Sequence, residues 1–404
     1  MTKKILQINS VVNTGSTGRI AEGIGQAAMS VGWESYIAYG RNERPSTSKT
    51  LRIGSSWDLK LHGIQTRLFD NHGLASDRAT NKFINDIELI KPNIIHLHNI
   101  HGYYLNYNIL FEYLNKTNIP IVWTLHDCWP ITGHCIYFTY VGCEKWKTEC
   151  YKCPQKKEYP ASWIFDRSRK NYILKKSLFK NIPNLTLIPV SDWLSGLIKI
   201  SFLKDKPTKV IHNGIDTNVF RPTSGISFRM KHKLQDKFII LGIANIWEPR
   251  KGLKDFFDLS ILLNDQFQIV LVGLNSRQIK QLPNNIIGIK RTESVNELVE
   301  LYQDSDVFVN PTYEDNFPTT NLESLACGTP VITYKTGGSP EAIDDSTGII
   351  VEQGNIIKLV DAINEIKSKG KMYYSDACVE RAHRLYRKED RYKEYIDLYE
   401  SLIK

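Results

Sequence analysis

The chain has 404 residues, of which 42% are hydrophobic, and this length exceeds the roughly 100 to 200 residues of one usual domain, so we expect two domains. No run of about 18 apolar residues occurs and the start MTKKILQINS lacks a signal pattern, which excludes a membrane-spanning helix and predicts an unprocessed cytoplasmic protein. The net charge of +9 suits partners that carry phosphate, namely a nucleotide, a nucleic acid or an anionic membrane; a basic surface that only keeps the protein soluble is the alternative.

The first half of the chain alternates short apolar runs with helical stretches. Runs of this kind predict the buried strands of a parallel, doubly wound α/β sheet. The expected strands are Lys4 to Asn9, Ser35 to Gly40, Ile94 to Asn99, Ile121 to His126, Leu185 to Ser191 and Lys209 to Gly214.

A glycine-containing loop follows the first expected strand. It includes Gly15 and Gly18, before a helix that we expect to begin near Ile20. Glycines at a strand-to-helix turn let backbone amides approach a phosphate or hydroxyl closely. The loop has neither the GxGxxG order nor the P-loop lysine, which argues against nicotinamide-binding and ATP-hydrolysing proteins.

Histidines follow two other strands of the first half. His126 and Asp127 end one strand, and His96, His98 and His101 follow the strand before it. A histidine at a strand end usually stabilises the fold. The alternatives for the three earlier histidines are a place in a binding cleft or on a metal.

Five of the seven cysteines lie in an insertion at residues 128–160. Four of them are Cys135, Cys143, Cys150 and Cys153, and the last two form a Cys-x-x-Cys pair. In a cytoplasmic protein this spacing favours a metal over disulfides, and tetrahedral zinc needs four such ligands. We predict a structural zinc on these four residues, with His134 or Cys128 as substitutes; an iron–sulfur cluster and free thiols are the alternatives.

The pattern of apolar runs starts again after a polar stretch at residues 221–237. A second set of strands therefore predicts a second Rossmann-like domain. The expected strands are Phe238 to Asn245, Gln268 to Gly273, Ile286 to Arg291, Val307 to Thr312, Pro330 to Thr336 and Gly348 to Glu352. We place the domains at 1–220 and 221–385, and an amphipathic helix at 386–404.

Two loops of the second half carry charged side chains at strand ends. Arg250 and Lys251 precede a helix, where two cations beside exposed amides suit a diphosphate. Farther on, Glu314 and Asp315 precede a helix that we expect near Asn321, capped by Thr319 or Thr320.

That helix is expected to carry Glu323 in its first turn, where the exposed amides favour a carboxylate. An ionised carboxylate only accepts hydrogen bonds, so Glu323 suits the paired hydroxyls of a ribose. A solvated loop and a helix N-terminal charge preference are the alternative reading of these acids.

Together these motifs resemble the retaining glycosyltransferases of family 4. The resemblance rests on Lys251-Gly252, on Asp315 eight positions before Glu323, and on three further segments: Gly328-Thr329-Pro330, Gly337 to Glu341, and the interdomain signature Val210 to Asp216. It spans nearly the whole chain. It implies the GT-B fold, in which two Rossmann-like domains face a cleft and the last helix crosses back onto the first domain.

The resemblance also implies roles for individual residues. Glu323 would bind the ribose of a sugar nucleotide, and Asp315 would replace the family's glutamate toward the donor hexose, with Glu314 as the alternative. Lys251 would clamp the diphosphate, and because the family's arginine position is Asn245 or Ile246 here, we infer that Arg250 supplies the second charge.

Further donor contacts follow from the same resemblance. His126 would donate a hydrogen bond to a hexose hydroxyl. The expected catalytic residues are therefore His126, Asp315, Arg250 and Lys251. The remaining expected donor-binding residues are Gly15, Gly18, Arg291, Thr292, Asn316, Asn321 and Leu322.

The resemblance predicts a retaining hexosyltransferase that uses a UDP- or GDP-linked sugar. The acceptor would be a glycan or a polyprenyl-diphosphate-linked oligosaccharide in capsule, exopolysaccharide or O-antigen synthesis. We expect no cofactor in catalysis, no nucleic-acid partner, and peripheral contact with the anionic inner face of the cytoplasmic membrane. The alternatives are a nucleotide-sugar epimerase of the same architecture and a zinc-stabilised nucleic-acid-binding protein.

Overall fold

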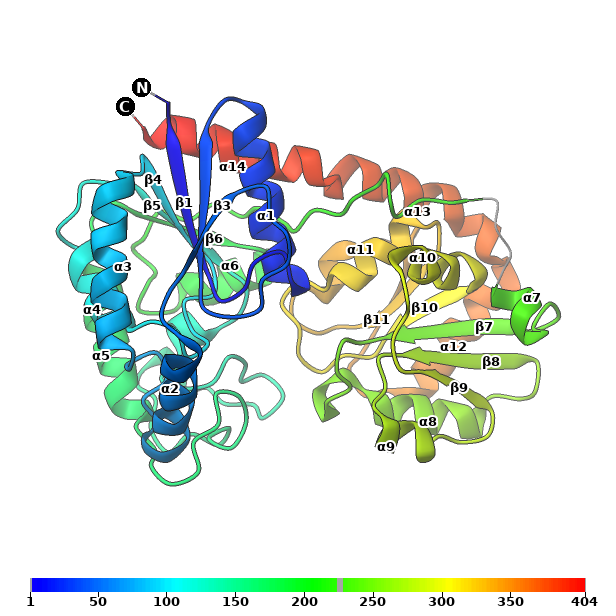
Figure 1. The fold of residues 1–404 in the computed structure, drawn as a ribbon. Helices are drawn as coiled ribbons and strands as arrows, with labels where there is room; N and C mark the ends of the chain where they lie inside the picture. The colour runs from blue at the N-terminus through cyan, green and yellow to red at the C-terminus, as the bar shows by residue number, and fades with distance from the viewer. Residues whose placement is uncertain (1, 224–227, 404) are drawn as a thin grey trace. The chain divides into compact units, whose positions relative to one another are not determined.

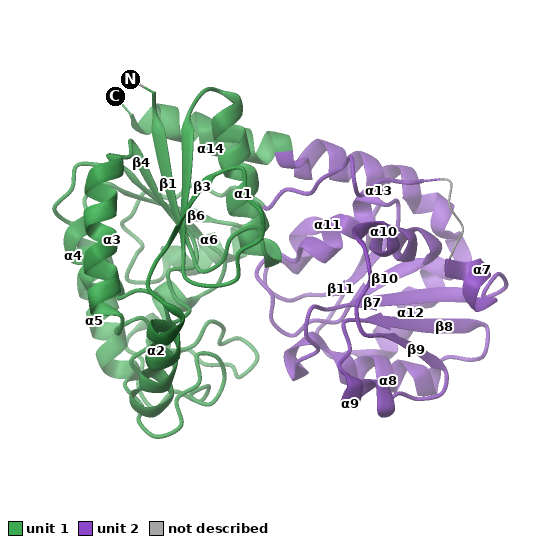
Figure 2. Cartoon of the chain, viewed as in Figure 1, with its two compact units in different colours: residues 1–212, 389–404 green, residues 213–388 purple. Residues whose placement is uncertain are grey.

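The computed structural model describes residues 2–223 and 228–403 (Figure 1). These residues form two compact units, each built on its own parallel sheet (Figure 2). Unit 1 comprises residues 1–212 and 389–404, and unit 2 comprises residues 213–388. The sequence pattern predicted the two boundaries after residues 220 and 385.

Unit 1 contains six parallel strands in the order β3-β2-β1-β4-β5-β6. The strands are β1 (Lys4–Asn9), β2 (Glu34–Tyr39), β3 (Lys49–Arg52), β4 (Ile94–Leu97), β5 (Ile121–Leu125) and β6 (Leu185–Pro189). The connecting helices are α1 (Gly15–Ser30), α2 (Ser56–Phe69), α3 (Asp77–Ile90), α4 (Tyr107–Leu114), α5 (Ser168–Asn181) and α6 (Asp192–Lys199), with short turns η1 (Trp129–Ile131) and η2 (Lys145–Lys147).

Both faces of this sheet are covered, as the apolar runs of its strands require. Successive residues of a strand point to opposite faces, so Ile5 joins one apolar cluster while Leu6 joins the other. The cluster around Ile5 includes buried residues of α1 and of the C-terminal helix α14 (Lys388–Leu402), among them Tyr395 and Tyr399. The last helix therefore completes the core of unit 1.

Two sequence predictions for unit 1 are wrong. The run from Lys209 to Gly214 is not a strand: its main chain makes two hydrogen bonds to β6, from Lys209 to Leu187 and from Ile211 to Pro189, which are too few for a ladder. The sheet has six strands because it contains β3, which was not predicted. Its polar sequence KTLR lies at the sheet edge and gives no apolar signal. In addition, α1 begins at Gly15 and not near Ile20.

Unit 2 contains all six strands predicted for it, in the order β12-β11-β10-β7-β8-β9. The strands are β7 (Phe238–Ile243), β8 (Phe267–Val272), β9 (Ile286–Ile289), β10 (Val307–Asn310), β11 (Val331–Tyr334) and β12 (Gly348–Val351). The helices are α7 (Phe228–His232), α8 (Leu253–Leu262), α9 (Ser276–Lys280), α10 (Val295–Asp304), α11 (Thr319–Ala326), α12 (Ile356–Lys369) and α13 (Lys371–Tyr386), with turns η3 (Pro249–Lys251) and η4 (Ser339–Ala342).

The strand orders place a switch point in each sheet, where consecutive connections leave in opposite directions. It lies between β1 and β4 in unit 1 and between β7 and β10 in unit 2. Parallel α/β sheets bind ligands at such points, beyond the carboxyl ends of the strands. In the part of the chain that the structure describes, none of the helices is long and apolar enough to span a bilayer.

Candidate active site

The charged loops predicted from the sequence meet at the switch point of unit 2. The loop after β7 carries Lys251, and the loop after β10 carries Asp315. The Nζ atom of Lys251 lies 2.5 Å from Oδ2 of Asp315. The main chain joins the two loops as well, because the Tyr313 amide donates to the Arg250 carbonyl at 2.7 Å. Basic and acidic groups 64 residues apart thus form one cluster at the edge where ligands bind.

Two glycines of the sequence motifs make this close approach possible. Gly252 has φ +75°, and a Cβ there would lie 2.1 Å from the Pro311 carbonyl oxygen. Gly337 has φ +55°, and a Cβ there would lie 1.8 Å from the Asp315 carbonyl oxygen. Only glycine meets both requirements at these positions. The Lys-Gly and Gly-Gly motifs therefore position the two charged loops.

Arg250 holds the acidic loop from the other side. Its Nη1 donates to the Glu314 carbonyl oxygen at 3.0 Å, and its Nε donates to the Glu248 carboxylate at 2.9 Å. Glu314 itself is buried, whereas Asp315 is partly exposed and points its carboxylate at Lys251. Both acids therefore lie beside a basic residue, Glu314 at Arg250 and Asp315 at Lys251, and the choice of Asp315 for a donor sugar stays a prediction.

Glu323 lies on α11, but not in its first turn. The helix begins at Thr319, two residues before the predicted start, and neither Thr319 nor Thr320 caps it; Pro318 occupies the cap position. Glu323 is therefore in the second turn. Its side chain is almost buried, and its Oε2 accepts a hydrogen bond from the Tyr302 hydroxyl at 2.9 Å. This bond fixes the orientation of a carboxylate that, when ionised, can only accept hydrogen bonds.

The side chains of two other predicted donor-binding residues are either hydrogen-bonded or packed inside unit 2. Asn321 accepts from the Asn310 side chain at 2.8 Å and donates to Ser339 Oγ at 3.0 Å, and Leu322 is fully buried. Contact of these two residues with a ligand would therefore use their main-chain amides, which lie in the first turns of α11. Asn316 is also buried, and its amide donates to the Asp315 carboxylate at 2.9 Å.

Arg291 and Thr292 stand apart from this cluster. They follow β9, which is the edge strand and lies two strands away from β7. Arg291 is exposed and Thr292 is half-buried. A role toward a nucleotide base stays a prediction for both.

Tyr302 and Asp255 are two residues near the cluster that the sequence motifs did not indicate. The Tyr313 hydroxyl donates to Asp255 Oδ1 at 3.1 Å, and burial raises the pKa of Asp255 to about 6. Asp255 lies in the first turn of α8 and Lys251 lies before that helix, so no helical spacing joins them. Tyr302 gives no sequence signal, because a buried tyrosine on α10 reads as core.

In unit 1, His126 belongs to a chain of hydrogen bonds. Gln7 donates from Nε2 to the Ala21 carbonyl at 2.7 Å, so its Oε1 faces His98 Nε2 at 3.0 Å and accepts from it. His98 Nδ1 then accepts from His126 Nε2 at 3.1 Å. Burial lowers the pKa of His126 to about 4, so the ring is neutral at pH 7. With Nε2 as the donor, the Nδ1 of His126 is an acceptor.

This arrangement revises the expected role of His126, which was to donate a hydrogen bond to a sugar hydroxyl. Its N–H is directed to His98, so its second nitrogen would accept a hydrogen bond from a hydroxyl. The other histidines of unit 1 have structural partners. His96 bonds Thr124 Oγ1 at 2.8 Å and the Tyr399 hydroxyl at 2.6 Å, and His101 Nε2 lies 2.9 Å from Asp127 Oδ2.

The two glycines predicted to lie near a donor are in the first turn of α1. A Cβ on Gly18 would lie 3.0 Å from the Val11 side chain, so the missing side chain lets α1 pack against the loop after β1. Gly15 has φ +65° and no neighbour within 4 Å of a Cβ position. The amides of this helix end lie at the switch point of unit 1, where an anion would be favoured.

Two family models match the chain. The Glycosyltransferase Family 4 model matches residues 25–219, and the Glycosyl transferases group 1 model matches residues 226–384. The chain belongs to the glycosyltransferases of the family 4 type and has the GT-B fold.

A curated relative and solved structures extend the match over the whole chain. The putative colanic acid biosynthesis glycosyl transferase WcaC of Escherichia coli is 24% identical over 420 residues, which cover 98% of this chain and 100% of the relative. The fold is similar to sucrose-phosphate synthase from Thermosynechococcus elongatus (TM-score 0.74, 18% identity, 99% of both chains). It is also similar to Anabaena HepE in complex with UDP (TM-score 0.70, 15% identity, 99% of this chain and 100% of that one).

Proposed function

We propose that this glycosyltransferase moves a hexose from a UDP- or GDP-linked sugar to a hydroxyl of a glycan or lipid-linked oligosaccharide, with retention at the anomeric carbon. The observation that carries the proposal is the cluster of Arg250, Lys251 and Asp315 at the switch point of unit 2. Glu323 lies on α11, the helix that follows the loop with Asp315. Cations, a fixed carboxylate and helix amides are the groups that a nucleotide diphosphate requires.

Each group has a distinct task in the proposal. Lys251 and Arg250 stabilise the negative charge that grows on the diphosphate as the bond to the sugar breaks. Glu323, held by Tyr302, accepts hydrogen bonds from the two ribose hydroxyls. Asp315 lies beside Lys251 and accepts a hydrogen bond from a hexose hydroxyl. Rate enhancement then comes from orientation and charge stabilisation, without a paired acid and base.

His126 supplies a hydrogen-bond acceptor in this proposal. A neutral imidazole with its N–H fixed by His98 accepts from a sugar hydroxyl without taking up a full positive charge. No cofactor is required for the step, because the basic residues take the place that a divalent cation would fill at a diphosphate.

The place in surface-polysaccharide synthesis is supported by the full-length similarity to WcaC, whose name states colanic acid biosynthesis. The similarity to HepE, solved with UDP, supports a nucleotide diphosphate as the ligand class. A glycan growing on a polyprenyl diphosphate suits a chain of net charge +9, which would be drawn to an anionic membrane surface. A location at the inner face of the cytoplasmic membrane is part of the proposal.

The test is a transfer reaction with UDP- and GDP-linked hexoses and a lipid-linked glycan acceptor, followed by mass spectrometry and NMR of the product. The proposal predicts one added hexose, with the anomeric configuration of the donor. An isomerised sugar nucleotide without transfer would identify an epimerase, and an inverted linkage would exclude the retaining mechanism.

A further inference from the structure

The cysteine-rich insertion of unit 1 encloses a small cavity that the proposed reaction does not use. Its volume is about 10 Å³, which is the space of one water-sized atom or ion. All four cysteines with metal-ligand spacing line it: Cys135, Cys143, Cys150 and Cys153. Each is a free thiol. Four thiols around a space for one ion match the requirement of tetrahedral zinc.

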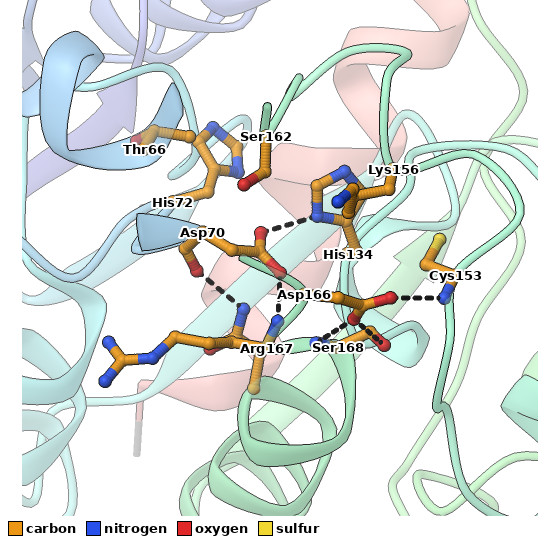
Figure 3. Close-up of polar contacts among 12 residues, drawn as sticks. Thr66, Asp70, His72, His134, Cys153, Lys156, Ser162, Asp166, Arg167 and Ser168 are labelled. Atoms are coloured by element: carbon orange, nitrogen blue, oxygen red, sulfur yellow. Dashed lines mark hydrogen bonds and ion pairs between the residues drawn. The ribbon is translucent and has the colours of Figure 1, made fainter. Parts of the chain in front are cut away.

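Local backbone contacts hold these cysteines in place. The Gly133 amide donates to Cys150 Sγ at 3.3 Å, which is the type of bond that stabilises a thiolate on a metal. A Cβ on Gly133 would lie 2.0 Å from the Ser168 carbonyl oxygen and 2.9 Å from Cys150 Cβ, so only glycine fits between α5 and Cys150. The Cys153 amide donates to Asp166 Oδ2 at 2.7 Å (Figure 3).

His134 provides an independent indication of a buried ligand. Its Nδ1 lies 2.6 Å from Asp70 Oδ1, and both side chains are fully buried (Figure 3). Its Nε2 is buried without a hydrogen-bond partner, although the ring lines the same cavity as the four cysteines. A buried ring nitrogen without a partner is costly, and an imidazolium paired with Asp70 would donate its Nε2–H to a metal-bound thiolate.

A buried cation also lies beside the cavity. Lys175 of α5 is 1% exposed and donates to the carbonyl oxygens of Trp129 and Thr132 at 2.8 and 3.0 Å. Zinc with four thiolates carries a net charge of about −2, and a buried lysine compensates such a charge.

We propose that Cys135, Cys143, Cys150 and Cys153 bind one structural zinc ion in this cavity. His134, held by Asp70, and Lys175 are positioning residues that stabilise the anionic centre without binding the metal. Among the described residues, no three of these sulfur atoms lie within 4.8 Å of one another, so binding has to draw the four side chains together. The zinc fixes an insertion that has little regular secondary structure, and its contribution is to the stability of unit 1.

The first experiment measures the metal content of the full-length protein, purified without added metal or chelator, by inductively coupled plasma mass spectrometry. The proposal predicts one zinc per chain in the wild type and loss of zinc in Cys150→Ser and Cys153→Ser. Cys327→Ser is the matched control, because Cys327 is a buried thiol of unit 2 and its loss leaves the zinc content unchanged. Metal-free wild type with a disulfide among the four cysteines would overturn the proposal, as would iron in place of zinc.

A second variant separates the ligands from the positioning residues. His134→Gln is predicted to retain one zinc but to release it faster to a chelator, whereas Cys143→Ser loses it. Loss of zinc in His134→Gln with retention in Cys143→Ser would overturn the assignment of four thiolates. If the cysteine variants do not fold, the visible spectrum of the wild type reconstituted with cobalt decides: tetrathiolate bands support the site, and their absence contradicts it.

Discussion

The Lys251 ammonium lies 2.5 Å from the Asp315 carboxylate and joins the loops that follow β7 and β10. If this lysine stabilises a departing diphosphate, its removal lowers the rate of transfer more than the affinity for the free nucleotide. We expect Lys251→Ala to lower kcat by about 10² to 10³, the usual effect of losing one such donor. The measurement is steady-state kinetics with the donor that the enzyme uses.

Lys254 offers the matched control for this prediction. It lies on the next turn of the chain and pairs with Asp258 at 2.6 Å on an exposed surface. Lys254→Ala removes the same charge near the same loop, so kcat should stay within about twofold of the wild type, as for most exposed pairs. Equal losses in both variants would mean that only the overall charge matters.

Glu323 should recognise the ribose. Glu323→Ala removes the acceptor of two hydroxyls, at a cost on the order of 1.5 to 3 kcal/mol, or about 10- to 150-fold in Kd. The decisive comparison is between a nucleoside diphosphate and its 2′-deoxy analogue, by isothermal titration calorimetry. The wild type should discriminate between them, and Glu323→Ala should bind both alike. A variant that still discriminates would remove Glu323 from the site.

The tautomer of His126 can be measured directly. The chain of bonds from Gln7 through His98 requires the Nε2–H form of both rings. Nitrogen-15 NMR of the imidazole rings at pH 7 should show this neutral tautomer for His98 and His126. An Nδ1–H form or an imidazolium at His126 would contradict the acceptor role. His126→Phe should lower kcat while leaving nucleotide affinity unchanged.

Buried histidines should make unit 1 sensitive to acid. Burial lowers the pKa of His62 and His126 to about 4, below the unfolded value of about 6.5. The unfolded chain therefore binds protons first, so stability is complete above about pH 6.5 and falls as the pH decreases toward 4. Urea unfolding across this range should show the decline.

His62→Gln tests this assignment. His62 accepts from the Gly73 amide at 3.0 Å through Nε2, a bond that protonation breaks. Removing this group should reduce the slope of unfolding free energy against pH by about 1.4 kcal/mol per pH unit within the window. An unchanged slope would show that His62 does not take part.

The C-terminal helix contributes to unit 1 through a buried hydrogen bond between Tyr399 and His96. Tyr399→Phe leaves His96 Nδ1 without its partner, so we expect a loss of about 1 to 3 kcal/mol in the free energy of unfolding. Tyr373→Phe, at an exposed position of α13, should change it by less than about 0.5 kcal/mol. Equal effects would mean that the His96 bond adds nothing.

Local sequence patterns predicted the strands of unit 2 and the charged loops that follow them. Parallel strands are buried on both faces, so β7 and β10 appear as apolar runs, and their carboxyl ends meet at one edge. Lys251 and Asp315 could therefore be placed near each other without a structure.

Features that depend on distant partners could not be predicted in this way. The polar strand β3 forms only because β2 offers it a parallel edge, and the run after Thr208 fails as a strand because it gains too few bonds to β6. The start of α11 was placed too late because its cap is Pro318 and not a threonine. The Tyr302 hydroxyl bonds Glu323, 21 positions along the chain, and His98 bonds His126, 28 positions along the chain.

The most direct test of the donor site in unit 2 is a thermal-shift comparison of the wild type and Lys251→Ala/Glu323→Ala with UDP, GDP, ADP, CMP and their sugar conjugates. A ligand that binds the folded state raises its stability with the logarithm of concentration over affinity. We predict that one diphosphate series raises the unfolding temperature of the wild type and leaves the double variant unchanged. No shift in the wild type with any nucleotide, or the same shift in both proteins, would contradict the assignment.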